Sequence, residues 1–343
     1  MKCELTREAI IDKVKKINDY WMAENPESGD SHWKRACYFV GIVSAYHMTG
    51  DRKYLDFAIK WANDNNWNYS QNGKSGHPSF ENADCQLCAE TYFQILDEAP
   101  DCGGTDKLIK EGMEACLADP RTNYWWWVDT IYMALPFYHI YGVGYNEPRC
   151  FEKAHGLFTD SRTNRTCYDE VEHMWYRDEN YLPFIQRSPA GKKIFWGRGE
   201  GWVLGGLART LENCPKDVKY YDEYKQVFCD MAEALVKWQR DDGFWNCNIV
   251  DDTHFGGPET SSTVLISFAL AKGINIGILD KDTYLPYILK AYRGMCEIAL
   301  NDEGRLGYVQ GVAGWPGPVY PETAMDYACG AFTRLSEELL QLI

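Results

Sequence analysis

Two acidic residues lie in surroundings where a carboxyl group could transfer protons. Asp129 lies inside Tyr124–Tyr141, a run that is almost entirely apolar and aromatic. A carboxylate in such a run is costly unless it is paired or functional, and burial raises its pKa so that it can hold a proton near neutral pH. The alternative is that Asp129 stabilises the N-terminus of a helix. The residues alone favour neither interpretation.

Asp84 is the second acid, in the segment ENADCQ from Glu81 to Gln86. Two carboxyl groups in one closed site push their pKa values apart, which supplies one acid and one base. Aspartate is also a preferred residue for capping a helix N-terminus. Taken alone, Asp84 is better explained as a cap.

The segment Phe195–Trp202 reads FWGRGEGW and brings an arginine together with aromatic and glycine residues. It has neither a Walker lysine nor a βαβ context, so it does not predict a nucleotide site. Arg198 could instead bind a carboxylate, and Trp202 could stack on a flat ring. His173 lies in the longest predicted loop, where a lone histidine is usually structural.

No metal or cofactor site is predicted. The seven histidines show no HExxH or similar ligand spacing. The one CxxC motif, Cys85 to Cys88, lies in a helical pattern with no second ligand pair. We expect both cysteines to be small buried side chains rather than redox or metal groups.

Helical periodicity dominates the chain, and alternating β-type runs are scarce. The pattern predicts helices over 5–24, 32–49, 51–65, 81–97, 104–118, 126–141, 147–159, 198–212, 217–240, 258–272, 281–299 and 322–342. The odd-numbered helices are amphipathic, whereas the even-numbered ones are apolar on nearly all sides and must be enclosed. Pro136 should kink the sixth.

This alternation predicts two concentric rings of six helices, an all-α (α/α)6 barrel formed as one domain by residues 1–343. The links from odd to even helices are the long ones, among them 66–80, 160–197 and 300–321. They should gather at one mouth of the barrel, where function is expected. The residues near the starts of the even helices meet there: Trp33, Asp84, Asp129, Arg198, Trp202 and Glu259.

Charge and composition exclude several partner classes. The formal net charge is −15, and no block of Lys and Arg suggests a nucleic-acid surface. The first residues mix charges through every turn, and no segment is apolar enough to span a membrane. The thirteen scattered cysteines suit reduced thiols, so a cytoplasmic protein is expected. The oligomeric state is not predicted.

Four blocks resemble the unsaturated rhamnogalacturonyl hydrolases, glycoside hydrolase family 105, and the related unsaturated glucuronyl hydrolases of family 88. They are WVDTIYMALPF from Trp127, FWGRGEGW from Phe195, ETSST from Glu259 and DYACGAF from Asp326. The resemblance covers about Trp33 to Phe332. It implies the same barrel and a substrate left by a polysaccharide lyase, an oligosaccharide whose terminal uronic acid carries a C4=C5 double bond.

The resemblance also implies roles for individual residues. Asp129 would protonate C4 and take a proton from the water that adds at C5, after which the hemiketal opens and releases the neighbouring sugar. Asp84 matches the family's second acid. The positions that match substrate contacts are His173, Arg198 and Trp202, together with Trp33 and Trp127 as stacking or pocket residues. No cofactor is implied.

Several alternatives remain open at this point. A rhamnogalacturonan fragment of pectin is the first expectation for the substrate, and another acidic glycan carrying unsaturated glucuronic acid is the second. A sugar epimerase on the same barrel would rely on paired histidines, for which His47 and His139 are available. A non-catalytic carbohydrate-binding protein would need no buried acid.

Overall fold

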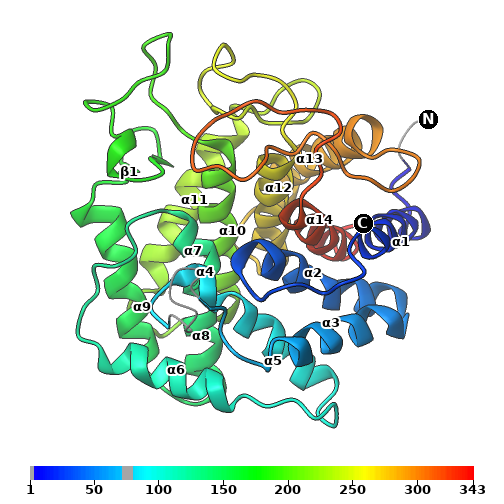
Figure 1. Cartoon of the computed structure of the whole chain (residues 1–343). Helices are drawn as coiled ribbons and strands as arrows, with labels where there is room; N and C mark the ends of the chain where they lie inside the picture. The colour runs from blue at the N-terminus through cyan, green and yellow to red at the C-terminus, as the bar shows by residue number, and fades with distance from the viewer. Residues whose placement is uncertain (1–3, 72–79) are drawn as a thin grey trace.

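The chain is mainly helical in the computed structural model, which describes residues 4–71 and 80–343 (Figure 1). The α-helices are α1 Arg7–Glu24, α2 Trp33–Thr49, α3 Arg52–Asp64, α4 Ala83–Gln86, α5 Cys88–Glu98, α6 Lys107–Ala118, α7 Asp129–Met133, α8 Leu135–Gly144, α9 Arg149–Thr159, α10 Gly197–Asn213, α11 Tyr221–Val236, α12 Thr260–Asn275, α13 Lys281–Gly294 and α14 Asp326–Leu339. Two short strands, β1 Tyr168–Asp169 and β2 Met174–Trp175, pair in antiparallel fashion.

Each of the twelve predicted helices is present, but two are broken. The helix predicted over 81–97 is divided into α4 and α5, and the one over 126–141 into α7 and α8. The second break falls at Ala134, whose φ of −134° is not helical, with Pro136 in the first turn of α8. Proline clashes with the preceding turn and lacks an N–H donor. The predicted disruption at Pro136 is therefore confirmed, and it takes the form of a break.

The helices form two rings. The inner ring consists of α2, α4–α5, α7–α8, α10, α12 and α14, and each member contacts the next. Helix α14 packs back against α2, which closes the ring. Every residue of α12 from Thr260 to Ile274 is buried, whereas the outer helix α3 buries only five of its 13 residues. Helix character thus sets the layer, and the predicted (α/α)6 barrel is confirmed.

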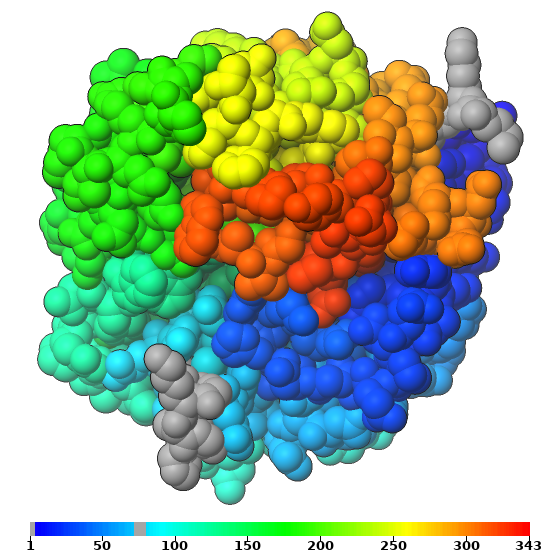
Figure 2. Space-filling view, turned by 45° about the horizontal axis from the view of Figure 1, so that its top comes forward, coloured from blue at the N-terminus to red at the C-terminus, as the bar shows by residue number. Residues whose placement is uncertain are grey.

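The inner helices all begin at the same end of the barrel, because an outer helix returns the chain after each of them. Among the long connecting segments, 160–197, 241–257 and 300–321 lie at this end, toward the top of Figure 1. The segment 300–321, orange to red, crosses the middle of the face shown in Figure 2. Of the predicted loop 66–80, residues 72–79 lie outside the described part of the chain.

Two further observations concern the described residues only. Cys85 and Cys88 are completely buried, and no group of three or more His, Cys, Asp or Glu side chains in 4–71 and 80–343 could hold a metal ion. Among the helices so described, none is long and apolar enough to cross a membrane. The assignment of residues 1–343 to one domain stays a prediction.

Candidate active site

A cavity of about 310 Å³ opens at the end of the barrel where the inner helices begin. Its walls are formed by Trp33, Asp84, Trp127, Asp129, Met133, Arg177, Arg198, Trp202 and the loop residues 312–315. Six of the seven site residues predicted from the sequence are thus brought together from four inner helices and the segment before α7. The seventh, His173, is not part of this lining.

Asp129 is the first residue of α7, and its side chain is only 15% exposed. Its Oδ2 atom is buried and has no hydrogen-bond partner among the described residues. Among the described residues the nearest cation is Arg177, whose Nε lies 3.7 Å away, too far for a hydrogen bond. Burial raises the pKa of Asp129, and the charges of Arg177 and Arg198 oppose this only in part. Burial therefore favours the protonated form of the carboxyl group, and no described residue accepts or donates a hydrogen bond at Oδ2.

Asp84 lies in the first turn of α4, but it does not cap that helix. The side-chain oxygen of Asn82 accepts the N–H of Asp84 at 3.0 Å and serves as the cap. Burial and, next, the charge of Asp129 raise the pKa of Asp84 to about 7, while Arg177 lowers it. The two carboxyl groups therefore interact electrostatically, as expected for a pair that shares one cavity.

Arg177 is the site residue that sequence reasoning missed. Its guanidinium lies over the Trp126 ring at 5.0 Å and donates from Nη1 to Asp178 Oδ2 at 2.5 Å. Its Nε is buried without a hydrogen-bond partner among the described residues. The backbone oxygen of Arg177 accepts the N–H of Val128 at 3.0 Å, which ties this loop to the start of α7. No local motif marks Arg177, because it follows a hairpin in an irregular loop.

Arg198 is 1% exposed and is engaged by the loop that closes the cavity. Its Nη1 donates to the carbonyl of Gln310 at 2.7 Å, and its Nη2 donates to those of Gly311 and Ala313 at 3.0 and 3.3 Å. The guanidinium also lies over the Tyr327 ring at 4.8 Å. Arg198 thus positions the 310–313 segment and contributes positive charge to the cavity.

Aromatic side chains form the flat surfaces of the cavity. Trp202 and Trp127 are 1% and 8% exposed, so their rings are fixed by packing. Trp33 is stacked on Tyr327 with ring centroids 5.7 Å apart. Rigid aromatic faces next to a few polar groups are the usual form of a small-molecule site. The arrangement suits a sugar ring.

His173 lies outside this cavity. It lines a separate groove with Val171 and Trp238, and its Nδ1 is 3.0 Å from the hydroxyl of Tyr168. Its φ of +54° places it in the turn of the β1–β2 hairpin. The side chain that this segment sends into the cavity is Arg177, four residues later.

Glu259 stabilises elements next to the site. It caps α12 by accepting the N–H groups of Ser261 and Ser262 at 2.9 and 2.6 Å. It also accepts the N–H of Gln310 at 3.0 Å. Glu259 therefore anchors the same loop segment that Arg198 holds, and it does not line the cavity.

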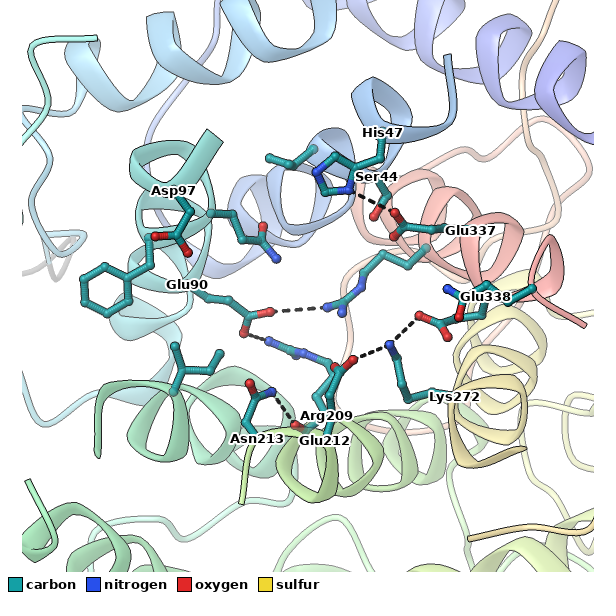
Figure 3. A pocket seen from close by; sticks show the side chains of 16 residues that line it. Ser44, His47, Glu90, Asp97, Arg209, Glu212, Asn213, Lys272, Glu337 and Glu338 are labelled. Atoms are coloured by element: carbon teal, nitrogen blue, oxygen red, sulfur yellow. Dashed lines mark hydrogen bonds and ion pairs between the residues drawn. The ribbon is translucent and has the colours of Figure 1, made fainter. Parts of the chain in front are cut away.

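A second cavity, of about 410 Å³, lies at the opposite end of the barrel (Figure 3). Its charged groups are largely paired with one another. Lys272 contacts Glu212 at 2.6 Å and Glu338 at 2.5 Å, and Arg209 pairs with Glu90. Paired charges of this kind connect the ends of the inner helices, and they leave few groups for a ligand.

The histidines considered for an epimerase lie toward this far end. His47 bridges Glu98 and Glu337 at 2.9 and 3.0 Å. His139 is completely buried, with Nδ1 2.9 Å from the carbonyl of Leu135. Neither lines the cavity that contains Asp129, and only His47 lines the one in Figure 3. Their positions do not provide the histidine pair that the epimerase alternative needs.

Known proteins resemble this chain over almost its whole length. A relative from Formosa agariphila, described as an unsaturated 3S-rhamnoglycuronyl hydrolase, is 30% identical over 330 residues, which are 90% of this chain and 84% of the relative. A solved structure from Bacteroides vulgatus, described as a glycosyl hydrolase of family 88, is 28% identical with a TM-score of 0.91, covering 99% of this chain and 100% of the other.

Another solved structure, described as a polysaccharide lyase, is 32% identical with a TM-score of 0.90 and covers 98% of this chain and 97% of its own. The sequence profile of glycosyl hydrolase family 88 matches residues 7–342. The resemblance to the family 105 and family 88 enzymes is thereby confirmed. The chain belongs to glycosyl hydrolase family 88.

Proposed function

We propose that this enzyme hydrolyses oligosaccharides that end in a Δ4,5-unsaturated uronic acid, and that the reaction takes place in the cavity around Asp129. The observation that carries the proposal is a buried carboxyl that faces a cavity with aromatic walls, has a raised pKa, and has no hydrogen-bond partner for its Oδ2 among the described residues. Family membership and the descriptions of the relatives support the same reaction class.

The reaction is a hydration of the vinyl ether in the unsaturated ring. Protonated Asp129 gives its proton to C4, and positive charge develops at C5 and the ring oxygen. Water then adds at C5 and returns a proton to Asp129, which forms a hemiketal. The hemiketal opens to a ketone at C5, and C1, now a hemiacetal carbon, expels the neighbouring sugar. Asp129 ends the cycle protonated, as it began.

Asp84 and Arg177 have distinct supporting roles in this scheme. Asp84, whose pKa is raised to about 7, interacts with Asp129 and helps to keep one proton on the pair. Arg177 has a buried Nε without a hydrogen-bond partner in the described chain and is the cation nearest to Asp129. It is placed to bind the carboxylate of the uronic acid through charge-assisted hydrogen bonds.

The identity of the leaving sugar is a separate and more specific proposal. The descriptions of two relatives name a rhamnoglycuronyl substrate, which favours rhamnose next to the unsaturated residue. Rhamnogalacturonan fragments of pectin also contain rhamnose and are a second candidate, and other glycans with unsaturated glucuronic acid are the alternative. A panel of unsaturated disaccharides with defined second sugars distinguishes these possibilities. Action in the cytoplasm also stays a proposal, to be tested by cell fractionation.

The test is to incubate the enzyme with lyase-generated oligosaccharides and to follow the absorbance of the C4=C5 bond. A hydrolase of this type removes the double bond, so the absorbance falls, whereas a lyase would create one and the absorbance would rise. We expect Asp129→Asn to lower kcat by about 10²–10⁴-fold, the usual contribution of a general acid. An Asp129→Asn protein with full activity would refute the assignment.

A further inference from the structure

A pocket of about 270 Å³, the Trp315 pocket, lies beside the active-site cavity. Its walls are Tyr181, Gln186, Ile194, His254, Phe255, Trp315 and Pro316. Trp315 lines both this pocket and the cavity around Asp129. The two spaces therefore adjoin at Trp315. Green, yellow and orange-red segments, which carry these residues, adjoin on the face shown in Figure 2.

Two aromatic rings in this pocket are exposed to water. Trp315 is 57% exposed and Phe255 is 41% exposed. Phe255 also has a φ of +61°, a left-handed conformation that is unfavourable for a bulky side chain. The loop holds it there, because the Phe255 carbonyl accepts the N–H of Cys247 at 3.3 Å. A strained backbone that presents a ring without burying it indicates a binding function.

The polar groups of the pocket are uncharged. Asn248 Oδ1 accepts the N–H of Phe195 at 3.2 Å, so Nδ2 of the same amide must be the atom that donates to His254 Nδ1 at 3.2 Å. The proton of the neutral imidazole is then on Nε2, as a donor. The Gln186 amide makes no hydrogen bond to other described residues and can act as donor or acceptor.

The backbone at Trp315 is connected to the active site by hydrogen bonds. Gln310 Nε2 donates to the carbonyl of Trp315 at 2.7 Å, and Gln310 Oε1 accepts from Trp196 Nε1 at 2.8 Å. Trp196 precedes α10, and Arg198 in turn binds the carbonyl of Gln310. The backbone at Trp315 is therefore held in place relative to the cavity.

We propose that the Trp315 pocket binds the sugar that follows the unsaturated residue, and that this sugar is a neutral pyranose with one apolar face against Trp315 and Phe255. The proposal rests on the hydrolase function proposed above. It follows from the shared Trp315, the exposed rings, and a lining that among described residues carries hydroxyl-binding groups but no formal charge. A charged second sugar would lose its hydration there without gaining a counter-ion.

The experiment compares two substrates that differ only in the second ring. One is the methyl glycoside of the unsaturated uronic acid, and the other is its disaccharide with a neutral deoxyhexose. We expect Phe255→Ala to lower kcat/KM for the disaccharide by about 3–10-fold, the value of one aromatic contact. The methyl glycoside should be hydrolysed at the wild-type rate, because it does not reach the pocket.

Phe184→Ala is the matched control, since Phe184 is 80% exposed near the same mouth but does not line the pocket. Tyr181→Ala changes another lining residue of the pocket and covers the case in which Phe255→Ala does not fold. Equal losses on both substrates, or no loss on the disaccharide, would overturn the proposal. A wild-type enzyme inactive on both would instead reject the hydrolase function. Calorimetric titration with the disaccharide would then test the pocket alone, and an unchanged Kd in Phe255→Ala would overturn it.

Discussion

Ionised Asp84 opposes folding, because burial and Asp129 raise its pKa from the ordinary 3.8 to about 7. The native state keeps a proton that the unfolded chain releases, so this contribution to stability is complete below pH ~4 and is lost as the pH rises through 7. Asp84→Asn does not titrate. We expect the variant to gain about 1–2 kcal/mol over the wild type between pH 4 and 8, after allowing for solvent at this partly exposed group.

Urea unfolding of both proteins at pH 4.5 and pH 8 measures this difference. The expected pattern is a variant that is relatively more stable at the higher pH. A stability difference that is the same at both pH values would show that Asp84 titrates normally in the folded protein, and that the two carboxyls do not share a proton.

Arg177 lowers the pKa of both carboxyls, and it is the first of the charges that oppose the effect of burial on Asp129. In Arg177→Met the pKa of Asp129 should rise, so the protonated acid persists to higher pH and the alkaline limb of kcat/KM moves upward. Loss of the carboxylate contact should also lower kcat/KM by about 10–100-fold, the cost of one charge-assisted bond.

Profiles of kcat/KM against pH for Arg177→Met and Arg177→Lys give the measurement. The lysine variant keeps the charge but not the two-pronged geometry, so its alkaline limb should stay near that of the wild type while its KM rises. Arg52→Met serves as the control, because Arg52 is on the outer helix α3 and is 57% exposed. An unshifted limb in Arg177→Met would contradict the electrostatic role.

His173 and Arg177 show where the sequence does not predict the direction of a side chain. Asp84, Asp129, Arg198 and the tryptophans of inner helices could be placed from the sequence, because helix starts converge in a two-ring barrel. His173 and Arg177 lie in an irregular loop, where side-chain direction depends on the hairpin β1–β2 and on the bond from Val128 N–H to the Arg177 carbonyl. Neither feature has a local sequence pattern.

At the scale of elements, apolar periodicity predicted the helices and their layers, because a helix enclosed on all sides must be apolar on all sides. It did not predict that α4 is a separate turn ending before Leu87, or that α7 begins only at Asp129, after the tryptophans. Those boundaries depend on the cap at Asn82 and on loop contacts. They decide which way each carboxyl points.

Arg198 stabilises the conformation of the loop that carries Trp315. The arginine binds the carbonyls of Gln310, Gly311 and Ala313 with one planar group. A lysine cannot reach all three, so Arg198→Lys should lose about 1.5–3 kcal/mol of charge-assisted bonding in this loop. Hydrogen exchange in a peptide covering residues 308–316 should become about 10–100-fold faster by local opening.

A peptide from α13, which Arg198 does not contact, is the internal reference for that experiment and should exchange as in the wild type. If the loop kept its wild-type protection while KM for the oligosaccharide rose, Arg198 would act through contact with the substrate. The two roles are separated by the same pair of measurements.

For the whole molecule, the ring of inner helices is closed by contact between segments almost 300 residues apart. Helix α14 packs against α2 at Gly330 and Gly41, where the backbones approach so closely that a Cβ on Gly330 would overlap the carbonyl of Cys37. Closure therefore depends on two residues without side chains. It also holds Trp33 and Tyr327, which lie in the first turns of these two helices, at stacking distance.

Gly330→Ala should consequently destabilise the closed ring by about 1–3 kcal/mol or more, as overpacking against a backbone usually does. Gly144→Ala is the matched control, because Gly144 ends α8 with no atom near its would-be Cβ, and alanine there should be neutral or slightly stabilising. Urea unfolding of the two variants gives the comparison. Because the contact positions Trp33 and Tyr327, Gly330→Ala should also raise KM for the oligosaccharide at urea concentrations where the variant is still folded. Equal stability of the two alanine variants would mean that α2 and α14 can separate without cost, and that the barrel does not need this contact to hold the site together.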